Sequence, residues 1–382
     1  MSAPPPPQAF AAALAGFDRM SVHRLLALLR HHPPEQAFAI AAGREAAPPG
    51  SLIRRVVDHD GTLRDAWRAS ALQRPPDRVW ERCLALGLEV SVLGDASHPG
   101  ACELDPLPSP VLFSKGDRQL LHGRRVALVG TRNATAAGRY VARTFGRELA
   151  AAGVHVVSGL ARGVDGHAHR GVLEGQLLAE LPGRPIAVVA SGLDVVYPGE
   201  HNTLWAQVGE GGLLLSEYPP GAAPAAYQFP LRNRLIAAFS EVVVVIESRE
   251  RGGSLITANA AAERGVPVMA VPGHVASRAA SGANGLLRDG AAPAIDVQDI
   301  LIALQLDHTR STAMLCDQRP HPNGDDRVVY EACAELPCTI GELARRCRLP
   351  LLEVAMSLAR LERDGWLAQA DGWFEAVGSP PA

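Results

Sequence analysis

Residues 242–246 form an unbroken run of β-branched side chains, and this run constrains the fold more than any other feature of the chain. A strand without alternating polar residues is buried on both faces, as in a parallel sheet that helices cover on each side. Residues 266–271 have the same apolar character, and a helix-like segment, residues 255–265, lies between the two runs. The pattern therefore predicts a strand–helix–strand unit of an open α/β sheet.

The residues just before that helix, Gly252, Gly253 and Ser254, predict an anion-binding turn. Glycine lets backbone N–H groups approach an anion closely, and a helix N-terminus favours negative charge. Thr257 lies one turn further along the same helix. Upstream, one short segment carries an aromatic ring, an amide and two guanidinium groups, on Phe229, Asn233, Arg232 and Arg234. Together these residues predict a phosphate-binding site at the edge of the sheet.

Two earlier strand-to-helix turns add arginines to the predicted site. Thr131 and Arg132 follow a strand at residues 126–129, and Arg162 follows a strand at residues 154–157. Doubly wound folds hold phosphates at such turns, along the carboxyl edge of the sheet. We expect Arg132 and Arg162 to bind backbone phosphates, although Arg132 alone would equally suit a surface arginine that caps a turn. Neither turn has the GxGxxG pattern of a dinucleotide site.

Phe229, with Tyr227 close to it in sequence, is a candidate for stacking on an unpaired base. Such stacking tolerates any base and requires a single strand, because duplex bases are not accessible. The alternative is that Phe229 anchors its loop in the core.

Three further polar residues are expected to support this site rather than to act on a substrate. Asp165 is predicted to cap a helix N-terminus, and His169 to be a structural histidine. Glu217 is expected to orient Arg232 or Arg234, since carboxylates hold guanidinium groups by paired hydrogen bonds. A role for Glu217 as a base is the weaker alternative.

Several segments in one order resemble the DprA/Smf family of bacterial DNA-processing proteins. They are VALVGTRNAT at 126–135, VVSGLARGVDGHAH at 156–169, FPLRNRLIAAFS at 229–240, GGSLITANAAAERG at 252–265 and VMAVPG at 268–273. The family usually has Ser-Gly-Ser where Gly252-Gly253-Ser254 stands here. The change removes a hydroxyl but keeps the backbone amides, so anion binding is expected to survive.

The resemblance implies an extended Rossmann-like α/β fold, a doubly wound and mainly parallel sheet. It also implies a homodimer that binds single-stranded DNA without sequence preference, protects incoming DNA during natural transformation and helps load the RecA recombinase. Neither enzymatic activity, a cofactor nor a metal is expected. The rival interpretation is a nucleotide-hydrolysing enzyme of the LOG type, but RGGSLITAN lacks the PGGxGTxxE pattern of that class. A scaffolding protein with a vestigial pocket is a third alternative.

The composition limits how a polyanion can be bound. The 382 residues carry a formal net charge of −3, so an anion site has to come from locally clustered arginines. The six cysteines form no CxxC pair and are expected to be reduced thiols. The N-terminus lacks the pattern of a signal peptide, and no apolar stretch is long enough for a membrane span, so a cytoplasmic protein is expected.

Changes in composition along the chain predict its domain organisation. We expect a disordered Pro-rich tail at 1–9, a helical domain at 10–93, and the Rossmann-like domain at 94–306. The resemblance to the DprA/Smf family implies that the helical domain is of the sterile-alpha or helix-hairpin-helix type. A linker at 307–325 should lead to a winged-helix domain at 326–377. Both small domains are expected to have structural or protein-contact roles, because the first lacks a clear hairpin glycine motif and the third helix of the second carries more acidic than basic residues. Direct DNA binding is the weaker alternative for each.

Overall fold

The computed structural model describes residues 4–103, 105–306, 319–370 and 372–377. Its centre is a sheet of nine strands in the order β1-β2-β6-β5-β4-β3-β7-β8-β9. Seven of them are parallel neighbours: β6 (Leu213–Ser216), β5 (Pro185–Val188), β4 (His155–Ser158), β3 (Arg125–Gly130), β7 (Val242–Glu247), β8 (Val268–Ala270) and β9 (Ala292–Pro293). The predicted β-branched run is β7, and it is buried along its whole length. The predicted fold class is confirmed.

The strand order reverses between β3 and β7. From β3 the chain runs outward through β4, β5 and β6, and it then returns to β7 on the other side of β3 and continues to β8 and β9. In open α/β sheets the crevice beyond such a reversal, at the carboxyl ends of the strands, is where ligands bind. The fold therefore indicates that a ligand would bind at the carboxyl edge of the sheet, near β3 and β7.

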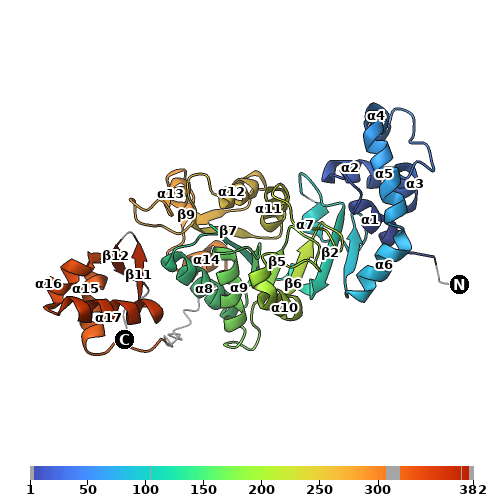
Figure 1. Cartoon of the computed structure of the whole chain (residues 1–382). Helices are drawn as coiled ribbons and strands as arrows, with labels where there is room; N and C mark the ends of the chain where they lie inside the picture. The colour runs from blue at the N-terminus through green and yellow to red at the C-terminus, as the bar shows by residue number, and fades with distance from the viewer. Residues whose placement is uncertain (1–3, 104, 307–318, 371, 378–382) are drawn as a thin grey trace.

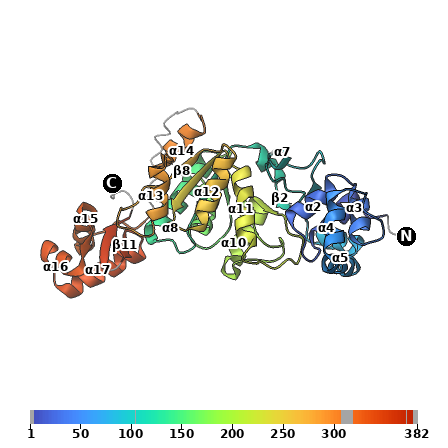
Figure 2. The ribbon, with the colours of Figure 1, turned by 90° about the horizontal axis from the view of Figure 1, so that it is seen from above.

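Helices cover both faces of the sheet (Figure 1). One face carries α8 (Ala136–Ala151), α9 (Val164–Gly175), α10 (Asn202–Gly211) and α14 (Val297–Ala303). The other face carries α11 (Gln228–Ala238), α12 (Gly253–Glu263) and α13 (Ser281–Arg288), which stand in front of the sheet in Figure 2. Alternate side chains of β3 and β7 enter the cores on the two faces, as expected for strands buried on both sides.

The N-terminal helices form a module at one end of the molecule (Figure 1). They are α1 (Pro7–Ala15), α2 (Val22–Leu29), α3 (Pro34–Ala41), α4 (Leu52–His59), α5 (Gly61–Gln73) and α6 (Pro76–Ala85). Their core continues into the sheet, because Phe38 and Trp67 belong to the same buried cluster as Phe113 and Leu214. The module is therefore packed firmly on the sheet.

Two predicted boundaries at the N-terminal end are corrected by the structure. The disordered tail was expected to reach residue 9, but α1 begins at Pro7 and buries Ala9. The sheet was expected after residue 93, but β1 (Glu89–Val92) already belongs to it. β1 pairs with β2 (Val111–Gly116) in antiparallel orientation, and β2 pairs with β6 in antiparallel orientation as well. The short segments between strands include α7 (Gly100–Glu103), η1 (Arg118–His122) and η2 (Gly199–His201).

The C-terminal module has the helices and hairpin predicted for a winged-helix domain. It comprises α15 (Asp325–Glu335), β10 (Cys338–Thr339), α16 (Ile340–Cys347), α17 (Leu351–Arg363), β11 (Leu367–Ala370) and β12 (Trp373–Ala376). Thr339 and Glu342 form a capping box at the start of α16. Arg319 stacks on Trp366 of the module, at 3.7 Å, and on Tyr140 of α8, at 5.1 Å, so it links the module to the sheet.

Some sequence expectations fall outside the described residues. Most of the predicted linker, residues 307–318, is among them, as is Cys316. Within the described part, Cys83, Cys333, Cys338 and Cys347 form no disulfide bond. No described helix is long and apolar enough to cross a membrane.

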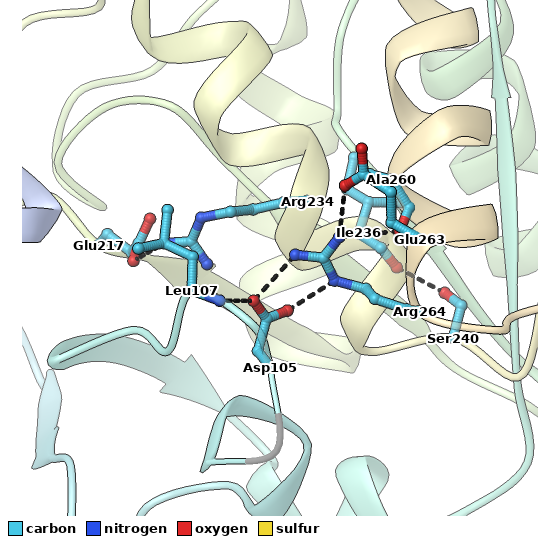
Figure 3. A network of polar contacts seen from close by, with 9 residues as sticks. All are labelled: Asp105, Leu107, Glu217, Arg234, Ile236, Ser240, Ala260, Glu263 and Arg264. Carbon is cyan, nitrogen blue, oxygen red and sulfur yellow. Dashed lines mark hydrogen bonds and ion pairs between the residues drawn. The ribbon is translucent and has the colours of Figure 1, made fainter.

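A buried ion pair ties the segment before β2 to α12 (Figure 3). Asp105 accepts two hydrogen bonds from Arg264, at 2.7 and 2.8 Å, and its side chain is fully buried. Removing one partner of a buried pair leaves an uncompensated charge, which costs about 3–5 kcal/mol.

We expect Asp105→Ala to lower the free energy of unfolding by about 3 kcal/mol or more, measured by chemical denaturation. The double substitution Asp105→Leu/Arg264→Leu removes both charges and should be less destabilising than Asp105→Ala. An Asp105→Ala protein as stable as the unchanged chain would contradict this role of the pair.

Candidate functional site

The turn between β3 and α8 lies at the strand-order reversal and is held by a buried carboxylate. Glu247, at the end of β7, accepts hydrogen bonds from the backbone N–H of Thr135, at 3.1 Å, and from its hydroxyl. The Glu247 carbonyl also accepts the N–H of Thr131, at 2.8 Å. Thr135 in turn caps α8 by accepting the N–H of Gly138. Glu247 thus fixes the turn that carries Arg132.

Glu247 is absent from the site predicted from the sequence. An acidic residue that ends a wholly apolar strand is a usable signal, because it must lie at the carboxyl edge of the sheet.

The turn between β4 and α9 interlocks with this first turn. The N–H of Val164 donates to the carbonyl of Thr131, at 3.2 Å. A Cβ atom on Gly163 would overlap that same carbonyl, and the backbone of Gly163 has a φ of +72°, so only glycine suits the position. The half-buried Thr131 therefore contributes its backbone to the packing of two turns.

The predicted role of Asp165 as a helix cap is wrong. The N-cap of α9 is Gly163, which makes no side-chain cap bond. Asp165 instead turns back and accepts the N–H of Gly159, at 3.1 Å, in the loop after β4. Burial raises the pKa of its carboxyl group, against the attraction of nearby Arg232. The buried Asp165 carboxyl group therefore stabilises the loop after β4.

His169 lies fully buried on α9, and its two ring nitrogens have no hydrogen-bond partner among the described residues. Burial, together with nearby His201 and Arg232, lowers its pKa to about 3. A neutral, enclosed imidazole fits the structural role expected from the sequence.

Three side chains, two from loops and one from the start of α11, stack at the carboxyl edge of the sheet. Phe229, in the first turn of α11, lies under the guanidinium group of Arg132, with 4.5 Å between the guanidinium carbon and the ring centre. The ring of Tyr197, from the loop after β5, lies 5.4 Å from that of Phe229. We call these three residues the edge stack. Tyr197 is 42% exposed, so the edge stack is open to solvent.

The partner of Phe229 differs from the one that the sequence suggested. Tyr227 is 67% exposed and makes no ring contact with Phe229 among the described residues, whereas Tyr197 does. Tyr197 lies 32 positions before Phe229, and only the packing of the loop after β5 against α11 brings the two rings together.

The prediction that Arg232 and Arg234 face a ligand is not supported, because both are buried, at 4% and 7% exposure. Arg232 donates to the carbonyls of Gly159, at 2.8 Å, and Val188, which lie after β4 and at the end of β5. Burial lowers the pKa of Arg232 to about 10. Its charge thus lies beneath the carboxyl edge, where α11 packs against the sheet.

Arg234 forms an ion pair with Glu217, which follows β6, so the orienting role expected of Glu217 is present (Figure 3). Both side chains are nearly enclosed, and burial raises the pKa of Glu217 despite the adjacent guanidinium group. This pair joins α11 to the end of β6.

The predicted anion-binding turn begins α12, with only part of it accessible. Gly252 is the N-cap, Gly253 is the first helical residue, and a Cβ atom on Gly253 would meet open space. Asn233 donates to the Gly253 carbonyl, at 3.2 Å. Ser254 is buried and donates to Ser248, at 2.9 Å, and Thr257 is only 1% exposed. The exposed residue of this turn is therefore Gly253, whose backbone N–H lies at the helix start, where N–H groups lack a partner within the helix.

Arg162 is exposed beside these turns. Its guanidinium group pairs with the exposed Glu200 at 2.8 Å. Exposed pairs of this kind contribute less than about 1 kcal/mol, so an incoming anion can replace Glu200. The residues that the structure brings to the accessible edge are thus Arg132, Arg162, Phe229, Tyr197 and Gly253. Among the described residues no cluster of metal-ligating side chains occurs.

Comparison with known proteins assigns the α/β region to one family. Residues 89–305 match the family model described as DNA recombination-mediator protein A. The chain is 35% identical over 292 residues to protein Smf of Escherichia coli, covering 74% of this chain and 73% of that protein. It is 41% identical over 264 residues to DNA processing protein DprA of Bacillus subtilis, covering 67% of this chain and 86% of the relative.

Two solved structures resemble the fold. DNA processing protein A of Streptococcus pneumoniae matches with a TM-score of 0.62 and 26% identity, covering 79% of this chain and 98% of that one. A structure of the Helicobacter pylori protein, described for its unique single-stranded DNA binding mode, matches with a TM-score of 0.50 and 30% identity. It covers 56% of this chain and 95% of its own.

The buried imidazole of His169 makes stability depend on pH. Its pKa is about 3 in the folded protein against 6.5 in a free histidine, so between these values the unfolded chain binds more protons. Stability should therefore fall as the pH drops below about 6.5, by about 2 kcal/mol between about pH 7 and about pH 5.

We expect His169→Leu to reduce this pH dependence, measured by urea denaturation at both pH values. The same substitution at the exposed His23 on α2 controls for loss of a histidine. Equal pH dependence in His169→Leu and the unchanged protein would contradict the assignment.

Proposed function

Because this chain belongs to the DNA recombination-mediator protein A family, also known as DprA/Smf, we propose that it binds single-stranded DNA along the carboxyl edge of its sheet. The observation that carries the proposal is the edge stack of Arg132, Phe229 and Tyr197. It combines an exposed aromatic surface with an arginine at the point where the strand order reverses. The aromatic surface suits an unpaired base, and the arginine suits the phosphate attached to it.

The rings of the edge stack offer a surface for an unpaired base. Stacking of a base on an aromatic side chain contributes about 1–3 kcal/mol and does not depend on which base is present. Arg132, already next to the Phe229 ring, can turn its guanidinium group to the adjoining phosphate. Duplex bases are stacked on each other, so this surface favours a single strand.

Phosphates on either side of the stacked base have further partners along the edge. We assign them to Arg162 and to the N–H groups at the start of α12, next to Gly253. The buried charge of Arg232 adds a positive potential from below without touching the strand. Contacts to phosphates carry no sequence information, so binding is independent of sequence.

The cellular roles that we propose follow from the family rather than from the edge stack. They are protection of incoming DNA during natural transformation, direct help in loading the RecA recombinase, and action as a homodimer. Slower nuclease digestion of a bound strand, earlier RecA assembly on single-stranded DNA and a dimeric mass in analytical ultracentrifugation are the respective expected results. An unchanged rate, an unchanged lag or a monomeric mass would contradict each in turn.

We expect Arg132→Ala and Phe229→Ala each to weaken binding of a labelled poly-dT oligonucleotide about tenfold, measured by fluorescence anisotropy across a salt series. The reasons are the loss of a phosphate contact and of a stacking surface. Only Arg132→Ala should reduce the salt dependence, by about 0.7 in the slope of log K against log salt.

The matched control is Arg143→Ala, which removes an exposed arginine of α8 whose partner is Glu174. It should bind DNA as the unchanged chain does. The buried Arg232 and Arg234 are poor test positions, because their loss would unfold the edge itself. Binding that is indifferent to both Arg132 and Phe229 would overturn the proposal.

A further inference from the structure

A cavity of about 370 Å³ lies where the N-terminal module meets the sheet. Arg74, Arg78 and Arg82 line one side of it, at the end of α5 and along α6. Pro220 and Gly221, from the loop after β6, line the other. Arg78 and Arg82 are four positions apart on α6, so they project from the same side of that helix.

Two of the three positive charges in this cavity, which we call the arginine cavity, are not balanced by an ion pair. Arg78 is exposed, Arg74 is half-buried against Gly16, and neither forms an ion pair with a described residue. No acidic side chain lines the arginine cavity. Asp77 and Glu81 are exposed on α6, outside the lining. Two unpaired guanidinium groups at a concave surface favour an anion, and phosphate suits them best.

One wall of the arginine cavity is held in place by Asp194. This nearly buried carboxylate accepts a hydrogen bond from Arg82, at 2.6 Å, and one from the N–H of Gly221, at 2.7 Å. A single side chain therefore fixes an arginine of the N-terminal module and the loop after β6. The other two guanidinium groups remain available to a ligand.

The arginine cavity and the edge stack are connected by the same two loops. Asp194 lies three residues before Tyr197, so their Cα atoms are at most about 11 Å apart. Gly221 lies in the loop that leads to Phe229 at the start of α11. A strand anchored at the edge stack thus brings its next phosphates within reach of the arginine cavity, where their effective concentration is high.

We propose that the arginine cavity binds a phosphodiester group of the same DNA strand that stacks on Phe229. This inference rests on the proposed single-stranded DNA binding and extends it to the N-terminal module, for which the sequence favoured a structural or protein-contact role over DNA binding. Arg78 and Arg74 hold the phosphate, and Arg82 contributes its charge from its place beside Asp194. Longer strands gain affinity because they reach both sites.

The test compares a short oligonucleotide of about 6 thymidines with one of about 20, in the full-length protein, by anisotropy across a salt series. Arg74→Gln/Arg78→Gln should weaken binding of the long oligonucleotide about fivefold to tenfold and lower its salt slope by about 0.7 per phosphate lost. Binding of the short oligonucleotide should not change. Arg78→Gln alone, at an exposed position, should show a smaller loss in the same direction and guards against misfolding of the double variant.

The matched control is Arg55→Gln/Arg64→Gln, which removes the same charge from exposed positions on α4 and α5. If the cavity variant and the control variant bind the long oligonucleotide with equal affinity, the inference is overturned. DNA binding at the edge stack would not be affected by that result. Failure of the unchanged protein to bind either oligonucleotide would overturn the proposed function instead. Cavity-dependent binding of a phosphoserine peptide, with DNA affinity unchanged, would assign the arginine cavity to a phosphoprotein and overturn its assignment to DNA.

Discussion

The accessible edge of this protein depends on the carboxylate of Glu247. It ends the first strand after the strand-order reversal, yet it bonds to Thr135, which begins the helix after β3. The charge is buried and is compensated by a backbone N–H, a hydroxyl and the N-terminal dipole of α8. One side chain therefore joins the two halves of the sheet where they diverge and fixes Arg132 between them. The place of Arg132 in the edge stack depends on this bond.

Buried arginines also stabilise the carboxyl edge, from within the protein. Strands that end together leave carbonyl groups without partners, and α11 covers them. Arg232 satisfies two of these carbonyls, and Arg234 pairs with Glu217 at the end of β6. Because these charges are fixed in the protein, they cannot reorient to meet a phosphate. They hold α11 in place, and with it the Phe229 ring, so the exposed contacts are made by loop residues and by the first residues of α11 and α12.

Features that depend on local interactions could be predicted from the sequence, whereas features that depend on long-range packing could not. The β-branched run predicted a doubly buried strand, and the glycine turns predicted which loops reach the carboxyl edge, because both depend on local chemistry. The burial of Arg232, Arg234 and Thr257 depends on how α11 and α12 are rotated against the sheet, which only tertiary packing decides. The contact of Tyr197 with Phe229 and the place of β1 in the sheet are likewise long-range.

The shared core of the N-terminal module and the sheet fixes the position of the arginine cavity relative to the edge stack. A module on a flexible linker would place Arg78 at a variable distance from the edge stack, and its contribution to affinity would fall with that freedom. Here the two bodies bury one apolar cluster, and Asp194 bonds across their boundary. The spacing between cavity and stack is therefore set before any ligand arrives. Preorganised spacing is what allows two modest phosphate and stacking sites to act on one flexible strand.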